Sequence, residues 1–179
     1  MTRWIALLRG INVSGKNQIP MQALKEGFSA LGYHAVRTCL NSGNVVFSAA
    51  ESQETALAEQ IQEMIRVRFA LQIPVFVLRQ DALNRLLAQA PAWWGTDDRA
   101  VYDNLIFVMP AVSALQIADE IGEPTEGLER IFILDQVIFW SFDRRLYAKA
   151  NWWKKTARAG IGEKLTIRTA NTLRKLAGL

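Results

Sequence analysis

Apolar residues follow two different periods along the chain, and the period predicts which segments are strands and which are helices. The segment Trp4–Arg9, which is apolar as far as Leu8, predicts a buried strand. After Pro20, apolar residues recur at spacings of three and four, which predicts one apolar helix face that ends at Gly32. The residues of this face are Met21, Leu24, Phe28 and Leu31.

Two short apolar and β-branched segments come next, Val36–Leu40 and Val45–Ser48. The cluster Asn41–Asn44 between them favours a tight turn, so we expect an antiparallel hairpin. A long helix with one apolar face and the strand Pro74–Leu78 complete the order β-α-β-β-α-β. That order is typical of the ferredoxin-like split βαβ plan, a four-stranded antiparallel sheet with two helices on one face. The residues of the apolar face are Leu57, Ile61, Met64, Ile65 and Phe69.

The same order of elements returns in the second half of the chain, after a helix with Leu83, Leu86 and Leu87 and the turn Pro91–Gly95. The expected elements are a strand at 105–109, a helix at 112–121, a hairpin at 131–134 and 137–140, a helix at 151–159, a strand at 165–167 and a closing helix at 169–176. The sequence thus predicts an α+β fold of two tandem ferredoxin-like (split βαβ) α/β plaits with antiparallel sheets. We expect a first unit at 1–80, a helix and linker at 81–102, and a second unit with a C-terminal helix at 103–179.

Composition narrows the class of protein. Half of the 179 residues are apolar, which is enough for a sizeable core. The longest apolar runs, such as Trp4–Leu8 and Val137–Trp140, are much shorter than the ~20 residues that cross a bilayer, and the N-terminus lacks the pattern of a signal peptide. Because Cys39 is the single cysteine, no disulfide within the chain can form. We therefore expect a cytoplasmic protein with no membrane association.

Charge is distributed unevenly along the chain. Residues 1–50 carry five basic and one acidic residue, residues 51–140 carry six and fourteen, and residues 141–179 carry ten and two. If the two basic ends meet in the fold, they form a positive surface suited to phosphate or another anion. If they lie on separate faces, they serve only as solvated charge.

Residues Gly10–Asn17, GINVSGKN, have the spacing G-x-x-x-x-G-K of a nucleotide-binding loop. In such a loop a strand leads directly into a helix whose N-terminus faces the phosphates, and a following Ser or Thr binds magnesium. Here Gln18–Pro20 intervene before the helix, Asn17 replaces the hydroxyl residue, and the next strands form a hairpin. The apolar run Ile131–Leu134 followed by Asp135 has the pattern of a Walker B strand, the usual partner of such a loop. Asp135 falls in the two-residue turn Asp135-Gln136 of a predicted hairpin, however, and aspartate is common in turns. We interpret the spacing as a coincidence.

The same loop remains the best candidate for a ligand site. Glycine N–H groups, amides and two cations at one end of the first strand suit an anionic or phosphorylated ligand, and the hairpin turn can lie beside them. The alternative is that the glycines shape the backbone and the asparagines hydrogen-bond it locally. The candidate ligand-binding residues are Arg9, Gly10, Asn12, Gly15, Lys16, Asn17, Ser42, Gly43 and Asn44.

A second candidate surface lies near the C-terminus, where tryptophans and cations interleave. Such a surface attracts nucleic acid, because cations neutralise phosphates and exposed rings stack on bases. Only one of two adjacent tryptophans can face outward on a helix, so we expect Trp152 or Trp153 in the core. The strand Gly43–Phe47 lacks the aromatic pattern of ferredoxin-like RNA-recognition domains. The candidate nucleic-acid contacts are Trp153, Lys154, Lys155, Arg158 and Arg168.

No constellation of residues in the sequence indicates conventional catalysis, a metal or a cofactor. The single histidine, His34, follows a helix and is expected in a surface loop, and Cys39 is expected to be a small core residue. The carboxylates, among them Glu129, fall in turns without converging. We expect a protein that binds an anionic ligand, with nucleotide or nucleic acid included. One alternative is an enzyme in which Arg9 or Lys16 stabilises a phosphate or carboxylate substrate that Asn12 and Asn44 orient. Another is a protein-interaction module whose tryptophans bury a partner surface.

Three segments of the chain are distinctive: Leu7–Asn17 with Pro20-Met21, then Gly32-Tyr33 with 36–38 and 42–47, and Thr166–Thr172. They resemble segments of the bacterial "LLRGINVGGKN" proteins, catalogued as Domain of Unknown Function 1697. Ser14 stands where that family usually has glycine, and Thr169-Ala170 stand where it usually has Asn-Trp. The likeness spans nearly the whole chain and implies a two-part α+β fold with ferredoxin-like pieces, but it brings no established activity.

Overall fold

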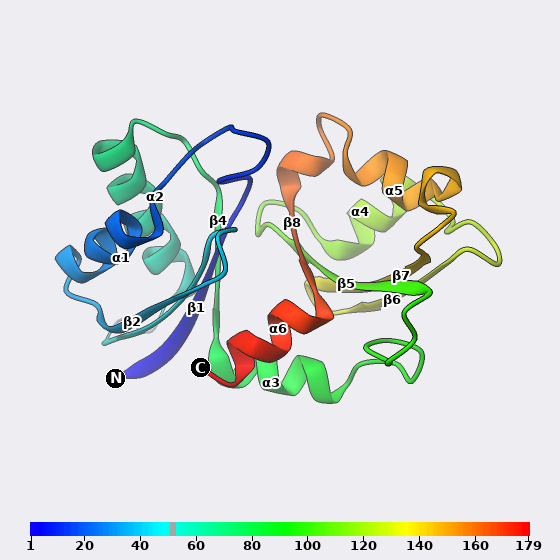
Figure 1. The fold of residues 1–179 in the computed structure, drawn as a ribbon, viewed down its shortest axis with the longest axis horizontal. Helices are drawn as coiled ribbons and strands as arrows, with labels where there is room; N and C mark the ends of the chain where they lie inside the picture. The colour runs from blue at the N-terminus through cyan, green and yellow to red at the C-terminus, as the bar shows by residue number, and fades with distance from the viewer. Residues whose placement is uncertain (51–52) are drawn as a thin grey trace. The chain divides into compact units, whose positions relative to one another are not determined.

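A computed structural model describes residues 1–50 and 53–179, and the described residues form two four-stranded antiparallel sheets (Figure 1). By their contacts they divide into two compact units, one of Met1–Leu87 with Arg174–Leu179 and one of Ala88–Leu173. The predicted fold class, two ferredoxin-like plaits, is confirmed by the sheet orders β2-β3-β1-β4 and β6-β7-β5-β8. The domain boundaries expected near residues 80 and 102 stay a prediction.

The first plait contains the elements up to α3. Strand β1 pairs with β3 on one side and with β4 on the other, and β2 pairs with β3, all antiparallel. The expected hairpin is therefore present. The elements are β1 (Thr2–Leu8), α1 (Met21–Ala30), β2 (His34–Cys39), β3 (Asn44–Ala49), α2 (Glu54–Phe69), β4 (Val75–Arg79) and α3 (Gln80–Ala88).

The first core lies between this sheet and the two helices α1 and α2, which Figure 1 shows on one side of the sheet. Alternate residues of β1, Trp4, Ala6 and Leu8, point into it because side chains of a strand alternate between its faces. Phe28 of α1 packs against Phe47 of β3 with ring centroids 5.3 Å apart. Burying a side chain of this size contributes about 1.5–3 kcal/mol, so the predicted apolar helix face is the feature that holds α1 to the sheet.

The second plait repeats the arrangement. Its core lies between the sheet and the helices α4 and α5, with Ile106 and Trp140 from the sheet, Ile117 from α4 and Trp152 from α5. The elements are β5 (Val101–Val108), α4 (Ala114–Ile121), β6 (Glu129–Leu134), β7 (Val137–Asp143), the 3-10 helix η1 (Tyr147–Lys149), α5 (Asn151–Thr156), the 3-10 helix η2 (Gly162–Lys164), β8 (Leu165–Thr169) and α6 (Ala170–Ala177).

Several element ends differ from the prediction. Strand β5 begins at Val101, four residues earlier than expected, because its first half, which includes the polar Asp103 and Asn104, pairs with the end of β7. Helix α4 begins at Ala114, since Ser113 forms a capping box with Gln116. Helix α5 ends at Thr156, before the left-handed Gly160. These corrections leave the order of elements unchanged.

Candidate functional site

The loop Gly10–Asn17 is a small β-hairpin. The N–H of Asn12 donates to the carbonyl of Asn17 at 3.2 Å, and the N–H of Lys16 donates to the carbonyl of Val13 at 2.9 Å. The two residues at its tip have positive φ, 51° at Ser14 and 73° at Gly15. This is the geometry of a two-residue turn with left-handed backbone at both central positions. The glycine-and-lysine spacing therefore belongs to a turn. It is not a phosphate loop that opens a helix, as the sequence indicated.

Two asparagine side chains hold this hairpin in place. Asn12 accepts the N–H of Ile19 at 2.8 Å and donates to the carbonyls of Ile19 and Asn41, both at 3.0 Å. Asn17 donates to the carbonyl of Gly10 at 3.0 Å. Both residues have positive φ, a conformation that asparagine tolerates well. The side-chain amides of Asn12 and Asn17 are thus hydrogen-bonded to backbone groups of the chain itself.

The turn between β2 and β3 lies next to the base of the hairpin. Gly43 accepts the N–H of Leu8 at 2.8 Å, and Asn12 reaches Asn41 across the two loops. Asn44 is fully buried, and its amide donates to the carbonyl of Cys39 and to the hydroxyl of Ser42, each at 3.0 Å. The structure therefore brings the predicted loop and turn together, and Asn44 closes the turn.

The cations of the predicted site occupy different environments. Lys16 is exposed near the hairpin tip, together with the whole segment Val13–Gln18. Arg9 is half-buried directly after β1, and its backbone N–H donates to the carbonyl of Pro74 at 3.0 Å. The cavities described beside β4 and between α1 and α2 are not lined by a residue of the loop. Lys16 is thus the cation that the hairpin presents to solvent.

The predicted nucleic-acid contacts fall into two groups. Trp153, Lys154 and Arg158 are exposed on and after α5. Lys155 instead donates from its Nζ to the carbonyl of Ile121 at 2.6 Å, at the C-terminal end of α4. Such a position favours a cation through the negative end of the helix dipole. It secures α4 against α5.

Arg168 is the other member of this set that turns inward. Its Nη1 donates to the hydroxyl of Thr166 and to the carbonyl of Ile167, both at 2.9 Å, and burial lowers the pKa of its guanidinium to about 10. Trp152 is fully buried and Trp153 is 43 % exposed, so the two adjacent tryptophans divide between core and surface as expected. Lys155 and Arg168 are partly exposed, and their cationic groups are hydrogen-bonded within the second unit.

One buried carboxylate escaped the sequence analysis. Glu129, expected in a turn, is the first residue of β6 and is buried. Its carboxylate accepts the indole N–H of Trp140 at 3.2 Å, the backbone N–H of Thr125 at 2.9 Å and the backbone N–H of Trp152 at 3.0 Å. It thereby ties the start of α5 to the sheet. No local pattern could have identified it, because its three partners come from three separate segments.

The other polar candidates have ordinary surroundings. His34 is exposed as the first residue of β2 rather than in a loop, and Cys39, expected in the core, is a partly exposed free thiol at the end of the same strand. Asp135 has φ 50° in the β6–β7 turn, where left-handed backbone favours it.

Among residues 1–50 and 53–179, no group of three or more His, Cys, Asp or Glu side chains is placed to hold a metal ion. No helix in that part of the chain is both long enough and apolar enough to span a membrane.

Comparisons with known proteins agree with the fold. The chain is similar to the conserved bacterial protein SP0830 of Streptococcus pneumoniae, with 27 % identity, a TM-score of 0.86, and coverage of 99 % of this chain and 97 % of that one. Among curated proteins, no match is found. A family model described as a protein of unknown function, DUF1697, matches residues 1–139. The chain, with its hairpin, its two plaits and its opening motif, belongs to the DUF1697 family.

Proposed function

We propose that this protein binds a small anionic ligand that bears phosphate at the hairpin Gly10–Asn17. The observation that carries the proposal is an exposed tip in which Lys16 follows two left-handed residues, Ser14 and Gly15. Main-chain N–H groups in such turns form anion-binding concavities, and a lysine beside them adds a charge that suits phosphate. The single cysteine supports a cytoplasmic location for this activity.

The asparagines support the proposal indirectly. Because Asn12 and Asn17 fix the hairpin through backbone hydrogen bonds, the tip holds its shape without a ligand. A site of fixed shape binds more tightly than one that must become ordered on binding. The ligand contacts proposed here are therefore the main-chain N–H groups of Ser14 and Gly15 and the side chain of Lys16, because the main-chain N–H of Lys16 already donates to Val13. Asn12, Asn17 and Asn44 position these groups. An enzyme in which Asn12 and Asn44 orient a substrate finds less support, because both amides are engaged elsewhere.

The test is an NMR titration of the backbone amides with inorganic pyrophosphate. We expect the largest shifts at Ser14, Gly15 and Lys16, and weaker binding by Lys16→Ala. Lys25→Ala, which removes another exposed lysine of the first unit, is the matched control and leaves the affinity unchanged. Equal losses in the two variants, or shifts spread evenly over all exposed lysines, would contradict the proposal, since they indicate general charge attraction.

A further inference from the structure

Four aromatic rings of the second unit form a continuous chain that reaches from the sheet to α5, and we call them the aromatic patch. Tyr102 of β5 lies opposite Phe142 of β7 with ring centroids 5.5 Å apart. Phe142 contacts Trp153 of α5 at 5.4 Å, and Trp153 contacts Tyr147 of η1 at 5.0 Å. The patch is assembled from four elements, so no single stretch of sequence displays it.

Three of the four rings are open to solvent. Tyr102 is 39 % exposed, Trp153 is 43 % exposed and Tyr147 is 45 % exposed, while Phe142 beneath them is buried. Single exposed rings are ordinary on a protein surface, but rings in contact with one another form a patch that indicates an interaction site. The buried Phe142 supports its neighbours and fixes their positions.

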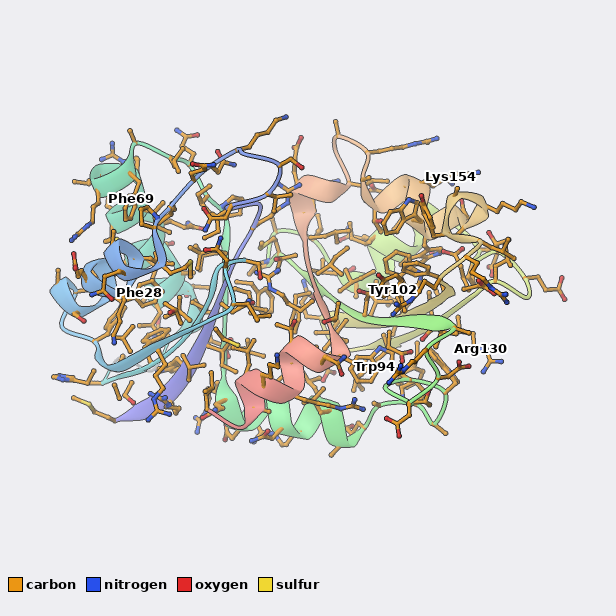
Figure 2. The ribbon with its side chains drawn as sticks, in the orientation of Figure 1. Phe28, Phe69, Trp94, Tyr102, Arg130 and Lys154 are labelled. Atoms are coloured by element: carbon orange, nitrogen blue, oxygen red, sulfur yellow. The ribbon has the colours of Figure 1, made fainter. Side chains whose placement is uncertain are left out.

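Exposed cations lie in the same segment of the chain as three of these rings. The guanidinium of Arg144 lies 4.1 Å above the ring of Tyr102. Arg145, Lys149 and Lys154 are exposed on the same short segment, in which residues 141–158 hold six basic residues and one acidic residue. Within the described part of the chain, none of these four cations forms an ion pair. Figure 2 labels Tyr102 and Lys154 in this unit.

The one acidic residue of this segment does not neutralise the patch. Asp143 is half-buried and its Oδ1 accepts the backbone N–H of Arg145 at 2.8 Å and that of Leu146 at 3.2 Å. These hydrogen bonds shape the turn that follows β7 and carry Arg144 and Arg145 at its surface. The segment thus presents positive charge beside open rings.

We propose that the aromatic patch binds single-stranded nucleic acid. Exposed rings stack on unpaired bases of any sequence, and lysine and arginine beside them neutralise the backbone phosphates. A duplex cannot use the rings, because its bases are already stacked on one another. A protein partner fits less well, since protein interfaces are depleted of lysine. Here the exposed Lys149 and Lys154 follow Tyr147 and Trp153 by two residues and one residue in the chain. This inference does not depend on the hairpin proposal, because it rests on other residues.

The structure also revises which residues take part. The residues of the predicted nucleic-acid surface that remain are Trp153, Lys154 and Arg158, because Lys155 and Arg168 are engaged within the second unit. Tyr102, Arg144 and Tyr147 are added by their ring contacts. Two kinds of contact with separate signatures result, stacking by the rings and charge neutralisation by the cations.

The test is fluorescence anisotropy with labelled oligouridylate and oligothymidylate of ~12 nucleotides, within the site sizes of comparable binders. We expect Trp153→Ala to weaken binding by at least about fivefold without changing the salt dependence, because it removes a stacking ring. Trp153→Phe retains a ring and restores most of the affinity. Phe132→Ala is the matched control, since Phe132 is also 43 % exposed but lies on β6 outside the patch.

A second measurement, the salt dependence of binding by lysine variants, tests the proposal even if Trp153→Ala folds poorly. Lys154→Ala should lower the slope of log affinity against log salt by about 0.7, the value for one phosphate contact on a single strand. Lys175→Ala, an exposed lysine of α6, should leave the slope unchanged. Absence of binding to either oligonucleotide, tighter binding of a duplex of the same length, or equal losses for Phe132→Ala and Trp153→Ala would overturn the proposal. So would binding to phosphatidylserine vesicles that oligonucleotides fail to displace.

Discussion

Gly43 provides a direct test of how tightly the β2–β3 turn fits against the first strand. It has φ 76°, and a Cβ atom at this position would lie 2.7 Å from Cβ of Leu8 and 3.0 Å from Cγ1 of Ile11. Cβ of Leu8 is attached directly to the backbone, so no change of rotamer can remove the overlap. Gly15 has nearly the same φ, 73°, but a Cβ there would meet nothing within 4 Å. The two glycines thus separate backbone strain from crowding.

The expected energies follow from this comparison. Placing alanine in the left-handed region costs about 1–2 kcal/mol at either position. Gly43→Ala adds the cost of forcing extra volume between the turn and β1, which is about 1–3 kcal/mol in a well-packed core. We therefore expect Gly43→Ala to lower the free energy of unfolding by about 2–5 kcal/mol. Since whole domains are stable by only about 5–15 kcal/mol, this loss is large.

The measurement is urea unfolding followed through the NMR amide signals of β1 and β3, which report on the first unit alone. Amide exchange at Leu8, whose N–H donates to Gly43, gives an independent local value. If Gly15→Ala proves as destabilising as Gly43→Ala, crowding does not contribute and the packing argument is refuted. If both variants are neutral, the left-handed conformations are also in question.

Two further predictions concern carboxylates. Glu129→Gln replaces one acceptor oxygen by an N–H₂ group that faces the N–H donors of Trp152 and Trp140, so we expect the second unit to lose about 1.5–3 kcal/mol in urea unfolding monitored by tryptophan fluorescence; an unchanged midpoint would show that the buried carboxylate does not support α5. The guanidinium of Arg79 holds the pKa of Asp81 below its ordinary value of 3.8. The contribution of the ionised Asp81 carboxylate to the stability of the fold is therefore present above pH 3.8 and is lost as the pH falls through the lowered pKa of the folded state. The midpoint temperature of thermal unfolding should fall more steeply below pH 3.8 for the wild type than for Asp81→Asn. Parallel plots of midpoint against pH for the two proteins would contradict this.

The opening motif shows how a spacing can mislead and how local context corrects it. GINVSGKN has the glycines and lysine of a phosphate loop, yet the chain around it forms a hairpin with a two-residue turn. The sequence already argued against a phosphate loop, because Pro20 comes after a spacer and an antiparallel hairpin follows, but it did not predict the hairpin within Gly10–Asn17 itself. The partners of Asn12 were not predictable, since Asn41 lies 29 residues away and is brought near only by the pairing of β3 with β1.

Fold class and order of elements were determined by the sequence itself. Local signals suffice to place strands and helices. Here these signals are the apolar periods of 2 and 3.6 residues, the turn Asn41–Asn44 and the helix-terminating Gly32. Element ends were less accurate where pairing with a neighbouring strand extends a strand past polar residues, as at the start of β5, or where a cap shortens a helix, as at Ser113.

Only the tertiary structure decided which polar and aromatic side chains act together. Lys154 and Lys155 are neighbours in sequence, yet one faces solvent and the other caps α4. Tyr102 and Trp153 lie 51 positions apart, yet both pack on Phe142. The physical reason is that periodicity assigns a residue to a face of its own element, whereas its partners depend on how separate elements pair and pack. The sequence therefore determined the framework, and tertiary packing determined which surfaces that framework presents.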